Sequence, residues 1–259
     1  MSSSYRTSLV PSEIPLPRVS VVIPTLNEER NLPHVLPRIP AWVHEVIVVD
    51  GNSTDNTVEV AKRLNDKVRV VMQKGKGKGN ALRLGFAEAE GEIIVMLDAD
   101  GSTDPEEIPM FVTPLLNGWH FSKGSRFIQG GGSADLSKFR SMGNKGLMLI
   151  TKLLFGGNYT DLCYGYNAFW RWTLEYILPD VDGFEIETLM NIRAIRANLR
   201  VVEVPSFEEE RIHGLSNLNA IRDGLGILRI ILKEWLNGRS IPVMGKHQLT
   251  PMASNVWTA

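Results

Sequence analysis

Two aspartates separated by one residue, Asp98 and Asp100, are the side chains of this sequence that point most directly to chemistry. They follow the apolar run 93–97 and precede Gly101, which is typical of a buried strand that ends in a turn. Two carboxylates at such a turn can converge on one Mg²⁺ or Mn²⁺ ion, which usually takes its other ligands from phosphates and water. The pattern therefore predicts a divalent-metal site for a diphosphate-containing substrate, with a solvated acidic turn as the alternative.

Three further predicted strands also end in polar, glycine-containing segments. The strands are expected at 19–23, 46–49 and 68–72, and the segments that follow them are 24–28, 50–55 and 74–80. Because ligands of parallel sheets bind beyond the carboxyl ends of the strands, these segments should form one site. Asp50 is suited to accept hydrogen bonds from a nucleobase or ribose, with a turn aspartate as the alternative. Asp55 is expected first to cap a helix.

The spacing of these strands predicts an α/β fold. Helical patterns at 28–36, 55–64 and 80–89 alternate with the strands, which gives repeated βαβ units and a doubly wound, mostly parallel central sheet with helices on both faces. The second half is mixed, with strands expected at 121–126 and 199–204 and helices at 138–155, 186–198 and 218–236. We expect a single domain over residues 18–238, a flexible segment over 1–17 and a flexible tail over 239–259.

The glycine-rich segment from Gly75 to Asn80 supports a competing hypothesis. It follows a strand, opens a helix and is followed about twenty residues later by an acid, as in a dinucleotide-binding fingerprint. However, Asn80 occupies the third glycine position, and the strand is the third rather than the first. Lys76 and Lys78 are better suited to direct phosphate pairing. A dehydrogenase therefore ranks below a sugar-nucleotide enzyme.

Composition narrows the class of protein further. The formal net charge of −1 over 259 residues gives no basic field for nucleic acid. The single cysteine, Cys163, excludes an intramolecular disulfide and favours a reducing, cytoplasmic compartment. No apolar signal-peptide core precedes residue 18, and the charge-poor stretch 108–122 falls short of the roughly 18 apolar residues of a membrane span. We expect a soluble or peripheral protein.

Together these motifs resemble family 2 glycosyltransferases of the GT-A fold. The resemblance rests on the motifs at 21–28, 48–55 and 98–100. Within this family, the chain is similar to the polyprenyl-phosphate branch, which is typified by dolichol-phosphate mannose synthases, and this closer similarity rests on the segments 124–126, 161–169, 203–205 and 211–216. The resemblance covers residues 18–235 and is more specific in the first half. It implies inverting transfer of a hexosyl group from a UDP- or GDP-sugar, with Mg²⁺ or Mn²⁺, to a polyprenyl phosphate.

The resemblance also implies roles for individual residues. The nucleotide would be held by Pro24, Thr25, Asn27, Glu28, Asp50 and Ala99, and the diphosphate by Lys78. The metal would be held by Asp98 and Asp100, with Ser102 at a place where relatives can supply a further ligand. Arg126 and Arg211 would bind the acceptor phosphate, which fits the planar fork of a guanidinium.

One departure from the family pattern bears on the acceptor. Where these synthases commonly read Gly-Phe-Arg-Ala-Phe, the chain has Asn167 in place of the arginine. A hydroxyl of a soluble metabolite or glycan is therefore the alternative acceptor, and it would need a carboxylate base. The candidates are Asp161, Glu185 and Glu187. The last two would share a face in an extended chain, but they also suit the first turn of a helix.

One histidine, one acidic run and two apolar stretches each have more than one interpretation. His213 and the acidic run 208–210 are expected at the solvent surface, although His213 is also placed to meet a phosphate or sugar. The apolar stretches 147–155 and 225–235 are expected to pack on the core, with contact to a membrane surface as the alternative. A non-catalytic nucleotide-sugar-binding module is the rival from another class. The sequence leaves open the donor's base and sugar, the choice between Mg²⁺ and Mn²⁺, and whether the chain forms an oligomer.

Overall fold

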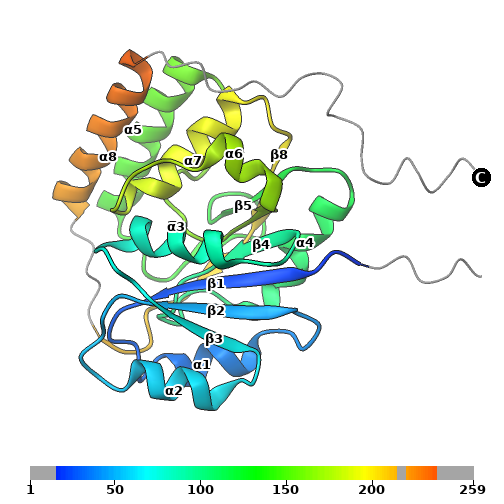
Figure 1. The fold of residues 1–259 in the computed structure, drawn as a ribbon. Coiled ribbons are helices and arrows are strands. Elements are labelled where there is room, and N and C mark those ends of the chain that lie inside the picture. The colour runs from blue at the N-terminus through cyan, green and yellow to red at the C-terminus, as the bar shows by residue number, and fades with distance from the viewer. Residues whose placement is uncertain (1–15, 215–219, 238–259) are drawn as a thin grey trace, which may run out of the picture.

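A computed structural model describes residues 16–214 and 220–237 of the chain. Most of the segments 1–17 and 239–259, which were expected to be flexible, lie outside the described residues, as do residues 218–219 at the start of the last expected helix. Figure 1 shows a central twisted sheet with helices on both of its faces.

The central sheet has seven strands in the order β3-β2-β1-β4-β7-β5-β8. Strands β1 to β4 are mutually parallel, β7 runs antiparallel to both of its neighbours, and β5 and β8 pair in parallel. The strands are β1 (Val19–Thr25), β2 (Glu45–Asp50), β3 (Val68–Met72), β4 (Ile93–Met96), β5 (Phe121–Ser125), β7 (Asn167–Trp170) and β8 (Val201–Pro205). The mostly parallel α/β fold expected from the sequence is confirmed.

Two layers of side chains bury the faces of the sheet. Alternate residues of β1 point to opposite faces, so Val21 and Ile23 join one core cluster and Val22 joins the other. The first cluster is covered by α1 (Leu32–Val35), α2 (Thr57–Leu64) and α4 (Ile108–Leu116). The second is covered by α3 (Lys78–Glu88), α6 (Leu174–Ile177) and α7 (Glu185–Arg196). This packing holds the carboxyl ends of β1, β2 and β4 at one edge.

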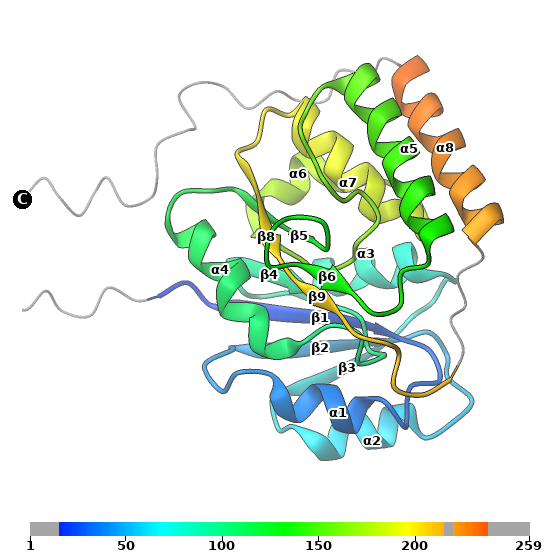
Figure 2. The same ribbon diagram turned by 180° about the vertical axis from the view of Figure 1, so that it is seen from behind.

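A second, smaller unit lies beside the last strands of the sheet. The short strands β6 (Gly132–Ser133) and β9 (Phe207–Glu208) pair in parallel. The helices α5 (Lys138–Phe155) and α8 (Ala220–Leu236) pack against each other at the outer side of α7, as both views show (Figures 1 and 2). Ile231 of α8 is fully buried against Leu162 and Ile192. The helices α5 and α8 thus extend the domain beyond α7, beside the last strands of the sheet.

The sequence missed β7 and overestimated the first helix. Only four residues form β7, which begins with Asn167, so it lacks the long β-branched run that marked the parallel strands. The expected helix 28–36 is limited to α1 and a following 3₁₀ turn at Leu36–Arg38. Pro33 and Pro37 each lack an amide proton, and each is the second residue of one of these short turns, where no intrahelical hydrogen bond from that amide is needed.

The search for membrane spans covered the described residues. Within that part of the chain, no helix is both long enough and apolar enough to cross a bilayer.

Candidate active site

The first two strand ends are joined by hydrogen bonds between their loops. The side-chain oxygen of Asn27 accepts from the amide of Thr54 at 2.8 Å, and the amide of Asn27 donates to the Ser53 hydroxyl at 2.8 Å. Asn27 has a φ of 59°, a left-handed conformation that asparagine tolerates. Asp50 is fully buried and accepts from the Ser53 amide at 2.9 Å and the Ser53 hydroxyl at 2.6 Å. These contacts fix the loops at one edge of the sheet.

The other predicted nucleotide-binding residues of β1 lie at the same edge. Pro24 pairs with Val49, and Thr25 pairs with Asp50 in the parallel ladder. The Thr25 hydroxyl donates to the carbonyl of Val49, and its own carbonyl accepts from the amide of Gly51 at 2.8 Å. The residues assigned to the nucleotide are therefore neighbours across β1 and β2. Asp55, which was expected to cap the helix, accepts from the amide of Thr57, the first residue of α2, at 3.1 Å, although the N-cap position itself is occupied by Asn56.

Asp98 lies directly beyond β4 and forms an ion pair with Lys78. The Lys78 Nζ atom is 2.5 Å from Asp98 Oδ1 and 2.6 Å from Glu187 Oε1. Burial alone would lower the pKa of Lys78, but the charges of Asp98 and Glu187 outweigh it and raise that pKa well above its ordinary value. Burial raises the pKa of Glu187, although the charge of Lys78 opposes this shift. Lys78 is thus a fixed cation between α3, β4 and α7.

Glycine makes room for this cluster. A Cβ atom on Gly165 would lie 2.7 Å from Glu187 Oε1, 3.0 Å from Lys78 Nζ and 3.1 Å from Asp98 Oδ2. A side chain at this position would therefore push apart the atoms of the ion pairs. The glycine of the 161–169 motif is explained by this close approach.

Asp100 is held on the other side of the same turn. Its Oδ1 atom accepts from the Ser102 amide at 3.0 Å and the Ser102 hydroxyl at 2.7 Å, and its Oδ2 atom is 3.2 Å from Arg211 Nη1. Arg211 also forms a close ion pair with Glu28, which is itself hydrogen bonded to Asn31. Ala99 is buried between the two aspartates. The turn therefore joins Asp100 to Ser102, and Asp98 lies two residues before Asp100 in the same segment.

Arg126 lies at the end of β5 in a buried ion-pair network. Its Nε and Nη2 atoms donate to the two carboxylate oxygens of Asp161 at 2.7 and 3.0 Å, and its Nη1 atom donates to Glu208 at 2.9 Å. A guanidinium has five N–H donors, and these contacts use three of them. The other two N–H donors of Arg126 are not used in these contacts. Glu208, expected in a solvated acidic run, is instead part of this network and also accepts from Ser133.

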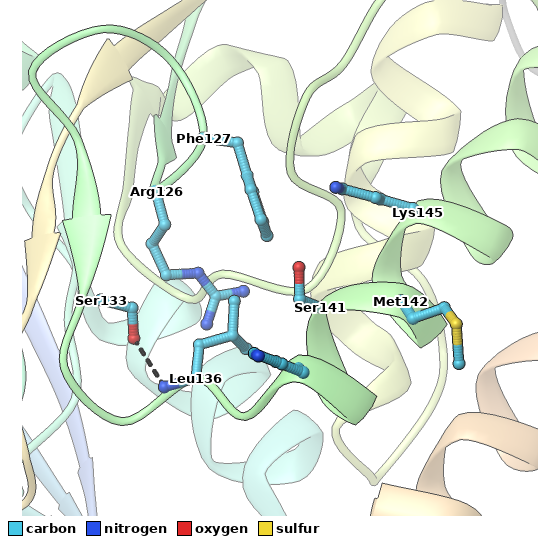
Figure 3. A pocket seen from close by; sticks show the side chains of 8 residues that line it. Arg126, Phe127, Ser133, Leu136, Ser141, Met142 and Lys145 are labelled. Carbon is cyan, nitrogen blue, oxygen red and sulfur yellow. Dashed lines mark hydrogen bonds between the residues drawn. The ribbon is translucent and has the colours of Figure 1, made fainter.

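A pocket of about 540 Å³ opens over Arg126 (Figure 3). It lies between the β6 segment and the start of α5, and Arg126 reaches into it from β5. Its lining includes the basic side chains of Lys138 and Lys145 and the apolar side chains of Phe127, Leu136 and Met142. The pocket therefore combines positive charge with an apolar wall.

A short chain segment connects this pocket to the Asp100 turn. Glu208 binds Arg126, and Arg211, three residues later, binds Asp100. The amide of Glu209 donates to the carbonyl of Ser102 at 2.8 Å. Three residues span at most about 10 Å, so the pocket and the carboxylate turn are neighbouring parts of one site.

The three candidate bases occupy different environments. Burial would raise the pKa of Asp161, but the hydrogen bonds from Arg126 and the charges of Lys123 and Arg126 outweigh it and hold that pKa below its usual value. Such a carboxylate is a poor proton acceptor. Glu185 and Glu187 lie in the first turn of α7 rather than in extended chain, so they do not share a face. Of the three, Glu185 makes no ion pair within the described residues.

Sequence reasoning missed Lys123. This lysine is fully buried on β5, next to the Arg126 network, and it lies directly across the ladder from Asn167 of β7. Burial lowers the pKa of Lys123, while Asp161 and Glu203 oppose the shift. Asn167, where the family commonly has arginine, thus has a buried cation as its cross-strand neighbour. The sequence signal was a lysine inside an otherwise buried strand.

His213, expected at the surface with a phosphate or sugar contact as the alternative, lies beside Arg211 and is partly exposed. Its Nδ1 atom is 3.3 Å from Arg30 Nη2, and its carbonyl accepts from Arg211 Nε at 2.8 Å. The backbone of His213 therefore helps to orient Arg211.

Comparison with known proteins identifies the class. Residues 20–177 match the family model described as glycosyl transferase family 2. The chain belongs to this family, which confirms the glycosyltransferase class predicted from the motifs and sets aside the dehydrogenase hypothesis for the glycine-rich segment.

Two curated relatives make the family assignment more specific. Over 210 residues, the chain is 34% identical to a dolichol-phosphate mannosyltransferase of Pyrococcus furiosus, covering 78% of this chain and 59% of that protein. The chain thus spans less than two thirds of that relative. It is 34% identical over 242 residues to a polyprenol monophosphomannose synthase of Mycolicibacterium smegmatis, covering 87% of this chain and 89% of the relative.

Solved structures support the fold. The chain superposes with a TM-score of 0.66 on glucosyl-3-phosphoglycerate synthase from Mycobacterium tuberculosis, at 25% identity, with 88% of this chain and 81% of that chain covered. That structure is a complex with Mn²⁺, uridine diphosphate and phosphoglyceric acid. The GT-A fold expected from the resemblance is confirmed.

Proposed function

We propose that this protein transfers a hexosyl group from a UDP- or GDP-sugar to a polyprenyl phosphate, with inversion, in a single displacement. The observation that carries the proposal is the adjacency of two sites. The carboxylate turn of Asp98 and Asp100 lies beside a pocket that has Arg126 at its base and apolar side chains on its wall. The family relatives named for dolichol and polyprenol phosphate support this choice of acceptor.

The carboxylate turn fits a hard divalent cation. Its donors are carboxylate and hydroxyl oxygens, and the oxygens of Asp98 and Asp100 already face the cations of Lys78 and Arg211. Within the described residues, no group of three His, Cys, Asp or Glu side chains is arranged to hold a metal. The other ligands would therefore come from phosphates and water. Bound Mg²⁺ or Mn²⁺ would stabilise the charge of the departing nucleoside diphosphate.

The donor would lie along the strand ends. Asp50, Asn27 and Thr25 form the ordered edge that would receive the nucleoside, with Pro24, Glu28 and Ala99 beside it. Lys78, at the start of α3, would meet the diphosphate. Helix N-termini favour anions because their amides and dipole carry partial positive charge.

A phosphate acceptor needs no protein base. Its second pKa is about 6, so it is largely ionised at neutral pH and can attack the anomeric carbon directly. Arg126 has two N–H donors that its ion pairs do not use, and Lys138 and Lys145 offset the negative charges of Asp161 and Glu208. The enzyme would then act by positioning the phosphate and the donor.

A transfer assay tests this proposal. Purified protein with Mn²⁺ or Mg²⁺ is expected to move label from one UDP- or GDP-sugar into the organic phase only when polyprenyl phosphate is present. The transfer rate should rise as the pH passes through about 6, because the acceptor phosphate loses its second proton there. Metal-dependent donor binding without transfer to any acceptor would instead indicate a binding module.

The hydroxyl acceptor is kept as a second candidate because of Asn167. With a hydroxyl acceptor, Glu185 would be the base, and the label would stay in the aqueous phase. The transfer rate would then rise with pH as a carboxyl group ionises, and this dependence would disappear in Glu185→Gln. The same assay therefore separates the two acceptors.

A lipid acceptor also implies contact with a membrane surface, and α5 and α8 are suited to it. Exposed apolar side chains recur on one side of α5, at Phe139, Met142, Leu149 and Leu153, with Lys138, Lys145 and Lys152 next to them. On α8, Leu225, Leu232 and Leu236 are exposed, with Arg229 and Lys233 close by on the helix. Amphipathic helices with cationic flanks bind anionic bilayers.

We therefore expect the protein to co-sediment with vesicles that contain phosphatidylglycerol. The double variant Leu149→Gln/Leu153→Gln should weaken this binding by about 10-fold, because two apolar side chains no longer enter the bilayer. The matched control, Met110→Gln/Leu116→Gln, changes two exposed apolar residues of α4 and should bind like the wild type. Equal binding of all three proteins would contradict the membrane role of α5.

A further inference from the structure

Both carboxylates of the proposed metal site are neutralised by cations of the protein itself. Asp98 Oδ1 is 2.5 Å from the Lys78 ammonium, and Asp100 Oδ2 is 3.2 Å from the Arg211 guanidinium. A divalent ion that is bound by these two aspartates would lie next to two positive charges. In this arrangement the metal alone therefore competes with Lys78 and Arg211 for the same oxygens.

Each of the two cations has a second carboxylate outside the metal pair. Lys78 is also 2.6 Å from Glu187, and Arg211 also pairs with Glu28. Either cation can therefore move away from its aspartate and keep one partner. The arrangement is repeated on the two sides of the turn, although Lys78 comes from α3 and Arg211 from the segment after β9.

The charges explain what would release these cations. The two aspartates balance Lys78 and Arg211, and Glu187 and Glu28 bring the six groups to a net charge of −2. A divalent ion alone would neutralise this total, but it would lie beside both cations and offer them no new partner. A nucleoside diphosphate, which carries two to three negative charges, offers oxygens to the metal and to both cations at once. Lys78 and Arg211 would then have phosphate oxygens as new partners.

We propose that Lys78 and Arg211 are internal counter-ions of Asp98 and Asp100, which give way to the metal when a nucleoside diphosphate accepts them. They are positioning residues that make metal and donor binding mutually dependent. This inference rests on the proposed function, because it takes Asp98 and Asp100 as the metal ligands. Its consequence is that the site stays closed to metal until the donor arrives.

Binding measurements test the exchange without any turnover. Free Mn²⁺ is measured by electron paramagnetic resonance during titration of the full chain, with and without UDP, and with GDP in parallel. In the wild type the nucleotide should raise the affinity for Mn²⁺ by roughly 100-fold, within the usual range of coupling between sites. In Lys78→Met the affinity without nucleotide should rise, and the coupling should fall below about 10-fold.

The ratio of the Mn²⁺ affinities with and without nucleotide, here called the coupling, shows whether Lys78 changes its partner or stays in place. A lysine that stays paired with Glu187 would change metal binding and nucleotide binding independently, and the coupling would remain at the wild-type value. Lys74→Met is the matched control, because it removes an exposed lysine just before the same glycine-rich segment. The double variant Lys78→Met/Glu187→Gln avoids a buried unpaired carboxylate and should behave like Lys78→Met.

The outcomes distinguish the two proposals. If the wild type binds neither Mn²⁺ nor a nucleotide, the proposed function fails. If it binds both cooperatively and both Lys78 variants keep the full coupling, only the counter-ion exchange is overturned. Arg211→Met should also raise the affinity for Mn²⁺ without nucleotide, and an unchanged affinity would remove Arg211 from the exchange.

Discussion

Replacing Asp100 with alanine should lower kcat/KM for sugar transfer by at least about 10³-fold, which corresponds to about 4 kcal/mol of transition-state stabilisation. Asp100 supplies one of the two carboxylates of the turn, and its loss would remove a ligand of the cation that faces the leaving diphosphate. The fold should persist, because Asp100 is partly exposed, its side chain contacts only Ser102 and Arg211 among the described residues, and alanine keeps the carbonyl that accepts from the Ile212 amide. Transfer assays and circular dichroism on the same preparation check both statements.

Asp66→Ala is the control for this experiment. Asp66 is exposed and precedes β3, at the opposite end of the strands, so the same chemical change occurs far from the turn. It should leave kcat/KM unchanged. Undiminished transfer by a folded Asp100→Ala protein would remove Asp100 from the metal site.

The parallel half of the fold was predictable because each of its strands is marked by a short apolar segment of the sequence. Residues 46–49 and 93–97 are continuous apolar runs, as expected for strands buried on both faces, whereas 19–23 and 68–72 are each interrupted by one polar residue, Ser20 or Arg69. Each of the four segments corresponds to a strand of the sheet. The polar residues that follow them then had to meet at one edge. Strand β7 escaped detection because its four residues pair antiparallel between two distant strands, and the short motif Asn167–Trp170 carries no period of its own.

The ion-pair partners of the site were not predictable from local patterns. Lys78, Asp98 and Glu187 come from three different elements, and only the packing of α7 against α3 brings Glu187 to the lysine. Asp161 was predicted as a candidate base and Arg126 as a phosphate ligand, without any sign that they pair. Residue types at strand ends thus located the site, whereas the charge state of each group depended on contacts between distant segments.

The Arg126–Asp161 pair gives the second large expected effect. Asp161 is fully buried, and the Arg126 side chain is 3% exposed. Removing one partner of a buried pair leaves an uncompensated charge, so Arg126→Met should lower the free energy of unfolding by about 3–5 kcal/mol at pH 7. Urea unfolding followed by fluorescence measures this loss.

The pH dependence of that loss identifies its cause. In the wild type the lowered pKa of Asp161 contributes stability that is present above the pKa of the unfolded chain and is lost as pH falls through the folded value. In Arg126→Met the buried carboxyl group loses its main hydrogen-bond donor, so its pKa should rise. The difference in stability between variant and wild type should therefore shrink as the pH is lowered from 7 towards 4. A constant difference would indicate lost packing rather than an unpaired charge.

A double variant separates this structural role from acceptor binding. Arg126→Met/Asp161→Asn removes the buried pair and keeps a side-chain oxygen for the amide of Cys163, while Glu208 loses Arg126 but keeps its hydrogen bond from Ser133. Part of the lost stability should therefore return. If Arg126 also binds the acceptor phosphate, the KM for polyprenyl phosphate should remain raised by roughly 10- to 100-fold, the value of a hydrogen bond to a charged group. The KM for the donor sugar should stay near that of the wild type. A double variant with partly restored stability and a normal acceptor KM would assign Arg126 to the fold alone. The acceptor phosphate would then have to bind elsewhere.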